Sequence, residues 1–218
     1  MLTKELISNS IPYLHKQDKV YQALQLMNDY HVVHLPVVEE DKYLGIISEE
    51  QLLHTDDHNK LEDLPISDGG TAVQANDHFL KAIQIAVQNK LSIVPVIEDE
   101  QIVGIVTYND LLRNASDFMS LNDPGALIVL ETESKNYSFT EINRIVESND
   151  AQITQLNTHT DPETGMMEIT IRVSKVEVSN IINSFQRYEY NVKYYFGEEM
   201  FENELRSNYD NLMHFLNI

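Results

Sequence analysis

The chain has 218 residues, 42% of them hydrophobic and 23% charged, which is typical of one or two globular domains with a substantial core. The formal net charge is −20, both halves are acidic and no basic patch is present, so we expect no nucleic-acid partner. The absence of cysteine excludes disulfides and thiolate chemistry. The start of the chain lacks the apolar core of a secretory signal, and no apolar run approaches the ~18 residues of a membrane span, so we expect a cytoplasmic protein without a membrane partner.

The first half of the chain contains an internal repeat with a shift of 59 residues. The aligned blocks are 35–38 with 94–97, 45–48 with 104–107, and 52–53 with 111–112. A match of this length without a gap predicts two copies of one unit, at about residues 10–56 and 69–116, within a module over residues 1–120.

Each copy has the pattern helix, strand, strand, helix. Apolar residues spaced i, i+3, i+4 and i+7 predict the first helix of each copy, with Val20, Ala23, Leu24 and Met27 in one and Phe79, Ala82, Ile83 and Ala86 in the other. Asp18 and Asp77 stand where a helix N-cap is expected. Two β-rich runs and a second helix follow in each copy, near 33–38, 43–48 and 49–55, and near 92–97, 101–107 and 108–116.

The two copies resemble CBS domains, which occur in tandem as adenine-nucleotide sensors, and the resemblance covers roughly residues 1–118. The ligand motif of that family is Gly-hydrophobic-x-Thr/Ser-x-x-Asp at a junction between a strand and a helix. Residues 104–110 match it in full, with Gly104, Thr107 and Asp110 at the defining positions.

The chemistry of this motif suits a nucleotide. A carboxylate such as that of Asp110 accepts two hydrogen bonds from the cis-diol of a ribose. The Thr107 hydroxyl and the N–H groups at a helix start favour a phosphate, and Gly104 allows backbone and ligand to approach closely. The alternative interpretation needs no ligand, because Thr107 can cap the helix while Asp110 stabilises its first turn.

The resemblance also implies where the base would lie. The adenine would contact Ala72 and Val73 from the opening segment of the second copy, together with Ser92, Ile93 and Pro95. AMP, ADP, ATP or another adenosyl compound is the expected ligand, and no cofactor is required.

The first copy departs from this motif. Gln51 stands at the position of the diol-binding Asp, while Glu49 and Glu50 add negative charge where a phosphate would lie. We therefore expect one competent site per chain.

The second half of the chain has a different pattern of elements. A turn at 122–125 marks a boundary, and a capping box at 138–141 begins a helix. The expected elements are a strand near 126–131, this helix, strands near 151–159 and 166–174 joined by a turn at 161–165, a helix near 178–185 and a strand near 191–196. The order βαββαβ is ferredoxin-like, which makes the whole chain α+β.

This order resembles the ACT domain over residues 124–197. The loop at 135–138 carries no glycine, so a ligand-free, dimerising role stands beside amino-acid binding. Residues 198–218 predict an amphipathic C-terminal helix. The recurring apolar residues of that segment are Phe201, Leu205, Tyr209, Leu212 and Leu216.

The domain order resembles the acetoin utilisation protein B family, whose members are regulatory. No nucleophile elbow, phosphate loop or zinc-protease motif is present, so we expect no enzyme and no catalytic residues. His54 and His58 read as solvated side chains rather than metal ligands. The leading interpretation is a homodimeric regulatory ligand sensor that acts on an unidentified protein, and the alternative is a ligand-independent scaffold.

Overall fold

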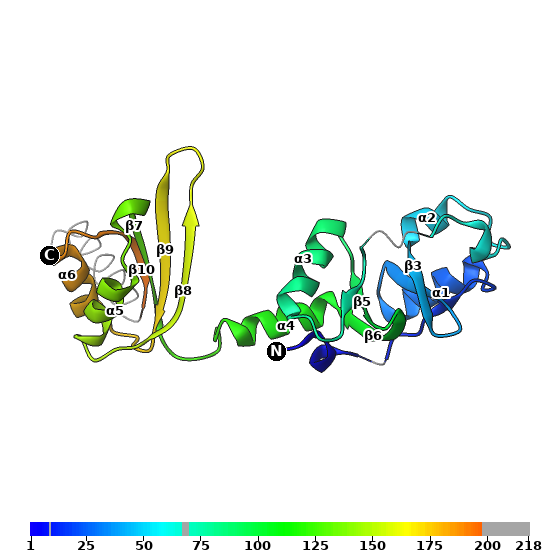
Figure 1. The fold of residues 1–218 in the computed structure, drawn as a ribbon, viewed down its shortest axis with the longest axis horizontal. Coiled ribbons are helices and arrows are strands. Elements are labelled where there is room, and N and C mark those ends of the chain that lie inside the picture. Colours follow the sequence, from blue (N-terminus) through cyan, green and yellow to red (C-terminus); the bar gives the residue numbers. More distant parts are fainter. Residues whose placement is uncertain (9, 67–69, 198–218) are drawn as a thin grey trace, which may run out of the picture. The chain divides into compact units, whose positions relative to one another are not determined.

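A computed structural model describes residues 1–8, 10–66 and 70–197 (Figure 1). The chain divides into two compact units, Met1–Asp117 and Phe118–Ile218, and each has its own sheet and hydrophobic core. The predicted C-terminal helix lies outside the described residues. In the described part of the chain, no helix combines the length and the hydropathy that crossing a bilayer requires.

The first unit is built around a six-stranded sheet. Its first half contains η1 (Thr3–Leu6), β1 (Leu14–His15), α1 (Val20–Tyr30), β2 (His34–Glu39), β3 (Lys42–Ser48) and α2 (Glu49–Leu53). Its second half contains η2 (Leu61–Asp63), β4 (Val73–Gln74), α3 (Phe79–Asn89), β5 (Ile93–Glu98), β6 (Gln101–Thr107) and α4 (Tyr108–Phe118). The strand order is β1-β2-β3-β6-β5-β4. From one edge it begins with the three strands of the first repeat, and from the other with the equivalent strands β4, β5 and β6 of the second. The predicted repeat is therefore confirmed. The halves of the sheet meet at one pair, Lys42 with Gln101.

Six of the eight residues in the predicted apolar helix faces are buried, and Leu24 and Ile83 are half-buried. The two predicted N-caps are wrong. The caps of α1 and α3 are Lys19 and His78. Asp18 instead accepts the His15 N–H at 2.7 Å, and Asp77 accepts the Gln74 N–H at 3.2 Å. Each carboxylate therefore closes the turn before the helix, a local bond that competes with capping.

The segments that precede the two repeats are exchanged between them. The Thr3 N–H donates to the Asp77 carbonyl at 2.9 Å, so the start of the chain packs on the second repeat. The Leu61 N–H donates to the Asp18 carbonyl at 3.0 Å, so the connecting segment packs on the first repeat. The repeats are thus interlocked, and their side chains form one continuous core.

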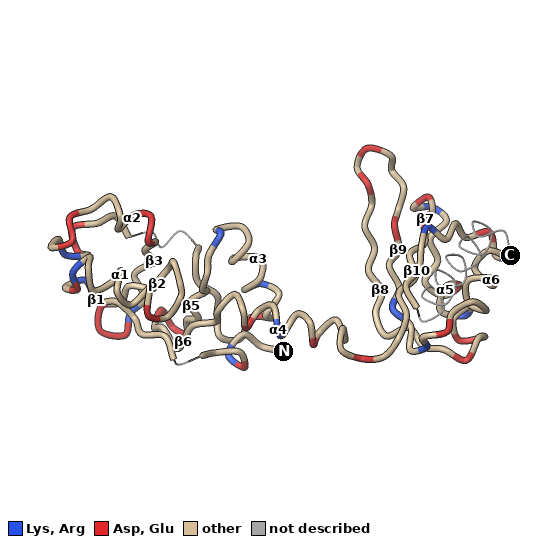
Figure 2. The backbone as a smooth tube through the Cα atoms, turned by 180° about the vertical axis from the view of Figure 1, so that it is seen from behind, with Lys and Arg blue, Asp and Glu red and all other residues tan. Residues whose placement is uncertain are grey.

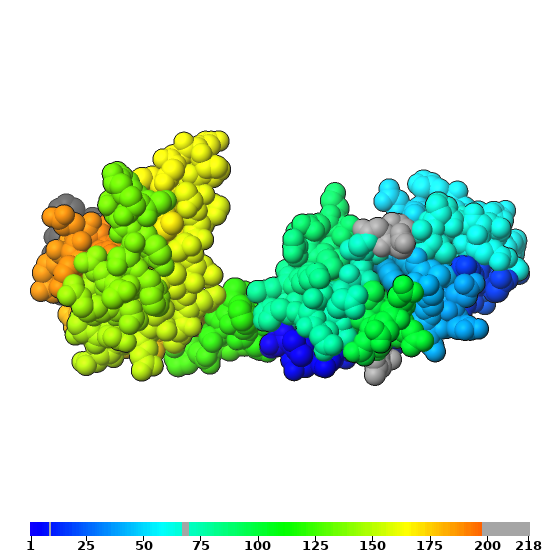
Figure 3. All heavy atoms as spheres, viewed as in Figure 1, coloured from blue at the N-terminus to red at the C-terminus, as the bar shows by residue number. Residues whose placement is uncertain are grey.

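The second unit is a four-stranded antiparallel sheet with order β10-β7-β9-β8. Its elements are β7 (Ala126–Glu133), η3 (Ser134–Asn136), α5 (Phe139–Glu147), β8 (Ile153–Thr160), β9 (Met166–Val173), α6 (Ser179–Arg187) and β10 (Asn191–Phe196), in the predicted order. The helices α5 and α6 pack on one face of the sheet, and the β8–β9 hairpin extends beyond them (Figures 1 and 3). Its tip carries Asp161 and Glu163, and Figure 2 marks the acidic residues along the chain in red.

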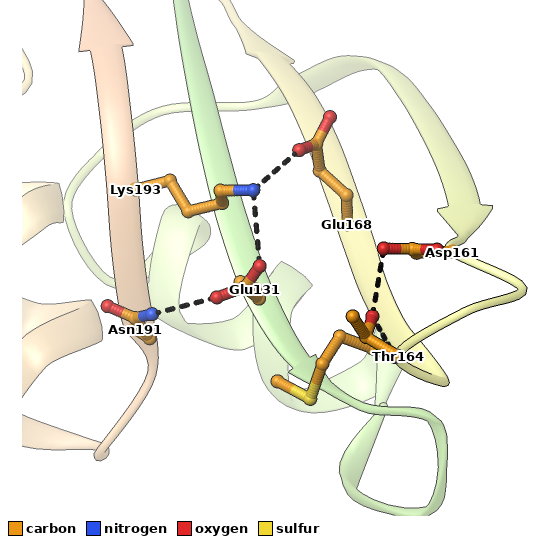
Figure 4. Close-up of polar contacts among 7 residues, drawn as sticks. Glu131, Asp161, Thr164, Glu168, Asn191 and Lys193 are labelled. Carbon is orange, nitrogen blue, oxygen red and sulfur yellow. Dashed lines mark hydrogen bonds and ion pairs between the residues drawn. The ribbon is translucent and has the colours of Figure 1, made fainter.

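The sheet face opposite α5 and α6 is polar near β10. Glu131 follows the buried Leu130 in β7 and therefore points away from the helices. Lys193 lies 3.1 Å from a carboxylate oxygen of both Glu131 and Glu168, and Asn191 bonds Glu131 at 3.3 Å (Figure 4). Hydrogen bonds to the two carboxylates raise the pKa of Lys193.

Candidate ligand-binding site

The junction of β6 and α4 is closed by reciprocal hydrogen bonds between two half-buried residues. The Thr107 hydroxyl donates to Oδ2 of Asp110 at 2.6 Å, and the Thr107 N–H donates to the same oxygen at 3.3 Å. The Asp110 N–H donates back to the Thr107 hydroxyl at 3.1 Å. This arrangement is a capping box, which fixes the Asp110 carboxylate at the helix start.

The first repeat has the same geometry with different chemistry. The Ser48 N–H donates to the Gln51 amide oxygen at 2.9 Å, and the Gln51 N–H donates to the Ser48 hydroxyl at 3.2 Å. A neutral amide replaces the carboxylate, and Glu49 and Glu50 occupy the first turn of α2. The two repeats therefore differ in charge at this position and not in fold.

A cavity of about 340 Å³ lies between the two repeats. It is lined by Lys42, Tyr43, Gly70, Ala72, Ile97 and Glu100. The Tyr43 hydroxyl of the first repeat and the Thr71 hydroxyl of the second are 2.7 Å apart, and this bond joins the repeats beside the cavity. Lys42 and Glu100 form an exposed ion pair of 2.8 Å. Sequence reasoning placed Ala72 here but missed the contribution of β3.

The cavity and the capping box lie near opposite ends of β5. Thr107 pairs with Ile93, and Ile97 lines the cavity four residues further along the strand, about 13 Å away. The register between β5 and β6 shifts between Val96 and Ile97, and the residues of β5 between the two ends are buried. Ala72 directly precedes Val73, which pairs with Val96. A ligand that contacts both ends must span this distance.

The other predicted contacts are less accessible. Val73 and Ile93 are buried in the core at 1% and 0% exposure, and Pro95 is buried as well. Ser92 is partly exposed, but its hydroxyl accepts the Val33 N–H at 3.1 Å. Of the predicted residues, the structure leaves Ala72, Ser92, Thr107 and Asp110 with some exposure, because the strands between them pack inward.

Gly104 has a different role from the one predicted. A Cβ atom built on it would lie 2.1 Å from Cγ2 of Ile7, so the space beside this glycine is filled by the start of the chain and not by a ligand. The Ser8 N–H fixes this approach by donating to the Ile105 carbonyl at 2.8 Å. One sequence signal was available: the pair Ile-Ser at 7–8 recurs at 66–67, which extends the 59-residue repeat upstream.

Other charged groups contribute little to this site. Arg113, one turn after Asp110, is exposed. His54 and His58 are both exposed, and the described residues contain no group of three side chains that could hold a metal ion.

The comparisons with known proteins concern mainly the first unit. Residues 4–57 and 66–117 match the family model of the CBS domain. Inosine-5'-monophosphate dehydrogenase of Methanocaldococcus jannaschii is 23% identical over 147 residues, which cover 66% of this chain and 29% of the dehydrogenase. An uncharacterized protein of the same organism is 25% identical over 167 residues, covering 75% of this chain and 62% of that protein. The chain thus spans less than two thirds of the length of either relative.

A crystal structure of a CBS domain pair/ACT domain protein from Thermotoga maritima has the same fold over the matched part. The TM-score is 0.50 at 20% identity, and the match covers 54% of this chain and 98% of that one. The first unit is therefore a tandem pair of CBS domains. CBS pairs are commonly regulatory sensors of adenosyl ligands, and the dehydrogenase is matched through its CBS region.

Proposed function

We propose that this chain is a cytoplasmic regulatory sensor, and not an enzyme, that binds an adenine nucleotide or related adenosyl ligand in the second CBS repeat. The observation that carries the proposal is the fixed Asp110 carboxylate at the start of α4, near one end of β5, with the cavity beside Ala72 near the other end.

Each end of the site suits one part of such a ligand. Asp110 binds the ribose diol through Oδ1, because both bonds from Thr107 fall on Oδ2. The phosphate lies near the start of α4, where the helix N-terminus favours an anion. The base occupies the cavity beside Ala72 and the ring of Tyr43.

The position of the cavity between the repeats suggests how binding is signalled. Tyr43 comes from the first repeat and Ala72 from the second, so the ligand prefers one arrangement of the two. A ligand shifts a conformational equilibrium by its difference in affinity for the two states. The signal then passes to the second unit, to a sister subunit or to an unidentified regulated protein.

We also propose that the chain is a homodimer. An apolar groove of about 90 Å³ runs between α3 and α4. Its most exposed side chains are Val87 at 62%, Leu112 at 63% and Tyr108 at 51%. The second unit, residues 124–197, is in this proposal a ferredoxin-like, ACT-like domain, supported by its element order and by the strand order of its sheet.

A ligand-independent scaffold is the second candidate function. Thr107 and Asp110 satisfy each other's hydrogen bonds without a ligand, and this observation favours the helix-capping interpretation. The apolar groove between α3 and α4 serves assembly in either case.

The test is a thermal-shift measurement with AMP, ADP, ATP and S-adenosylmethionine on the wild type, Asp110→Ala and Gln51→Ala. Both substitutions remove a capping-box side chain at equivalent positions, so each costs about 1 kcal/mol in buffer. A ligand at 100 times its Kd stabilises by about 2.7 kcal/mol. We expect one ligand to stabilise the wild type and Gln51→Ala but not Asp110→Ala. Equal stabilisation of all three refutes the assigned site, and no stabilisation of the wild type favours the scaffold.

A further inference from the structure

The two repeats are joined by a cluster of hydrogen bonds at the start of β2 and β5. His34 is the first residue of β2, and its Nδ1 accepts the Ser92 N–H at 3.2 Å. The Ser92 hydroxyl lies 3.2 Å from the same nitrogen and accepts the Val33 N–H at 3.1 Å. Ser92 is thus bonded to the first repeat through both its backbone and its side chain.

This geometry requires the neutral form of His34. Nδ1 accepts a backbone N–H only through its lone pair, so the ring proton is on Nε2. A second proton on Nδ1 would point at the Ser92 N–H and break that bond. Burial lowers the pKa of His34 below its usual value, in the same direction as the hydrogen bond.

Charged and titratable residues occur on the elements next to His34. Glu49 and Glu50 follow Ser48, which pairs with His34, and His31 precedes β2. Lys90 precedes β5, and Tyr108 and Asp110 are in the first turn of α4. Burial of the ring is the cause of the lowered pKa of His34.

Ser92 connects His34 to the candidate nucleotide site. Its carbonyl accepts the N–H of Tyr108 at 3.0 Å, and Tyr108 is the first residue of α4. Tyr108 directly follows Thr107, which holds Asp110. A path therefore runs from the His34 ring through the backbone of one residue, Ser92, to the helix start that in our proposal binds the phosphate and ribose.

The equivalent path in the other direction uses a different acceptor. In the 59-residue alignment Val33 corresponds to Ser92, and its carbonyl accepts the Glu49 N–H at 2.9 Å, as Ser92 does with Tyr108. The Val33 N–H donates to the Ser92 hydroxyl, whereas the Ser92 N–H donates to the imidazole of His34. Each repeat thus holds a helix start of the other, and of these two paths only the one to α4 begins at a side chain that titrates near neutral pH.

We propose that His34 is a positioning residue for the nucleotide site of the second repeat, and that this site binds its ligand more weakly once His34 is protonated. The inference rests on the proposed function and adds a regulation to it: affinity falls as the pH drops through the pKa of His34.

The first test needs no ligand. The imidazole of His34 and the amides of Ser92, Tyr108 and Asp110 are followed by NMR from pH 8 to pH 5 in the wild type and in His34→Asn. The Asn side-chain oxygen is as many bonds from the backbone as Nδ1, so it can accept the Ser92 N–H, and it does not titrate. We expect the three amides to shift with the midpoint of His34 in the wild type and to show no such transition in His34→Asn. If the chemical shifts of these amides do not follow the titration of His34, the proposal is overturned.

The second test measures the Kd of the best nucleotide from the thermal-shift panel against pH. The phosphate of the ligand itself titrates near pH ~6, so the readout is the ratio of wild-type to His34→Asn Kd at each pH, in which that titration cancels. We expect a ratio near 1 at pH 8 that rises about threefold to tenfold below the pKa of His34, the range of one lost hydrogen bond. His34→Ala, which has no acceptor, should bind more weakly at every pH.

A flat ratio overturns the coupling even if the nucleotide binds well. No nucleotide binding at any pH, with amides that still follow His34, refutes the proposed function and leaves the link between His34 and α4 in place. The two failures are therefore distinguishable.

Discussion

Replacing Gly104 by alanine tests the packing of the chain start against the second repeat. The added Cβ would lie 2.1 Å from Cγ2, 3.1 Å from Cγ1 and 3.2 Å from Cβ of Ile7. Ile7 is branched at Cβ and cannot simply rotate its end away. Gly104 does not have a left-handed φ, so the cost is steric and not a matter of backbone strain. Overpacking of this kind costs about 1–3 kcal/mol, or roughly 4–12 °C in the Tm of a unit this size.

Calorimetry of the full chain measures this loss, and a double-mutant cycle with Ile7→Ala identifies its origin. The Ile7→Ala substitution removes the clashing atoms, so the double variant should be no less stable than Ile7→Ala alone. The resulting coupling should be about 1–3 kcal/mol. A Gly104→Ala variant within about 0.5 kcal/mol of the wild type, or additive losses in the double variant, would refute the packing that we describe.

Two further predictions concern the α3–α4 groove and the second unit. Leu112→Glu places a charge on the exposed groove between α3 and α4. Light scattering should then show a monomer, and thermal unfolding should give a Tm near that of the wild type, because the substituted residue is exposed. A variant that remains a dimer would exclude this interface. Tyr190 donates to Glu141 at 2.8 Å, and burial together with that carboxylate raises the pKa of Tyr190. The pKa of Tyr190 in the folded protein exceeds its value of ~10 in the unfolded chain. The stability that Tyr190 contributes to the fold is therefore present below pH ~10 and is lost as the pH rises above it. Tyr190→Phe should cost about 1 kcal/mol at neutral pH and flatten the alkaline loss of stability in urea titrations; an unchanged alkaline slope contradicts this reading.

Much of the candidate site could be predicted from the sequence because the repeat is a comparison within one chain. The shift of 59 residues aligns Thr107 and Asp110 with Ser48 and Gln51, so the replacement of the carboxylate by an amide in the first repeat is visible without a structure. Helix faces and strand runs follow from local periodicity and were found for the same reason. The N-caps were misplaced because an Asp can bond the turn before a helix as readily as the helix itself.

The sequence by itself determined the repeat, the order of the longer helices and strands in both units and the residue types at the β6–α4 junction, since each depends on spacing along the chain. It did not reveal the two-residue edge strands β1 and β4. Only the tertiary structure decided which of those residues remain accessible and which are bonded to another repeat. Ile7 reaches Gly104, Tyr43 reaches Thr71 and His34 reaches Ser92 across at least 28 residues of chain. The exchanged start of the chain brings Ile7 to Gly104, and the packing of the two repeats on each other brings together His34 and Ser92. No local pattern encodes a contact between residues so far apart.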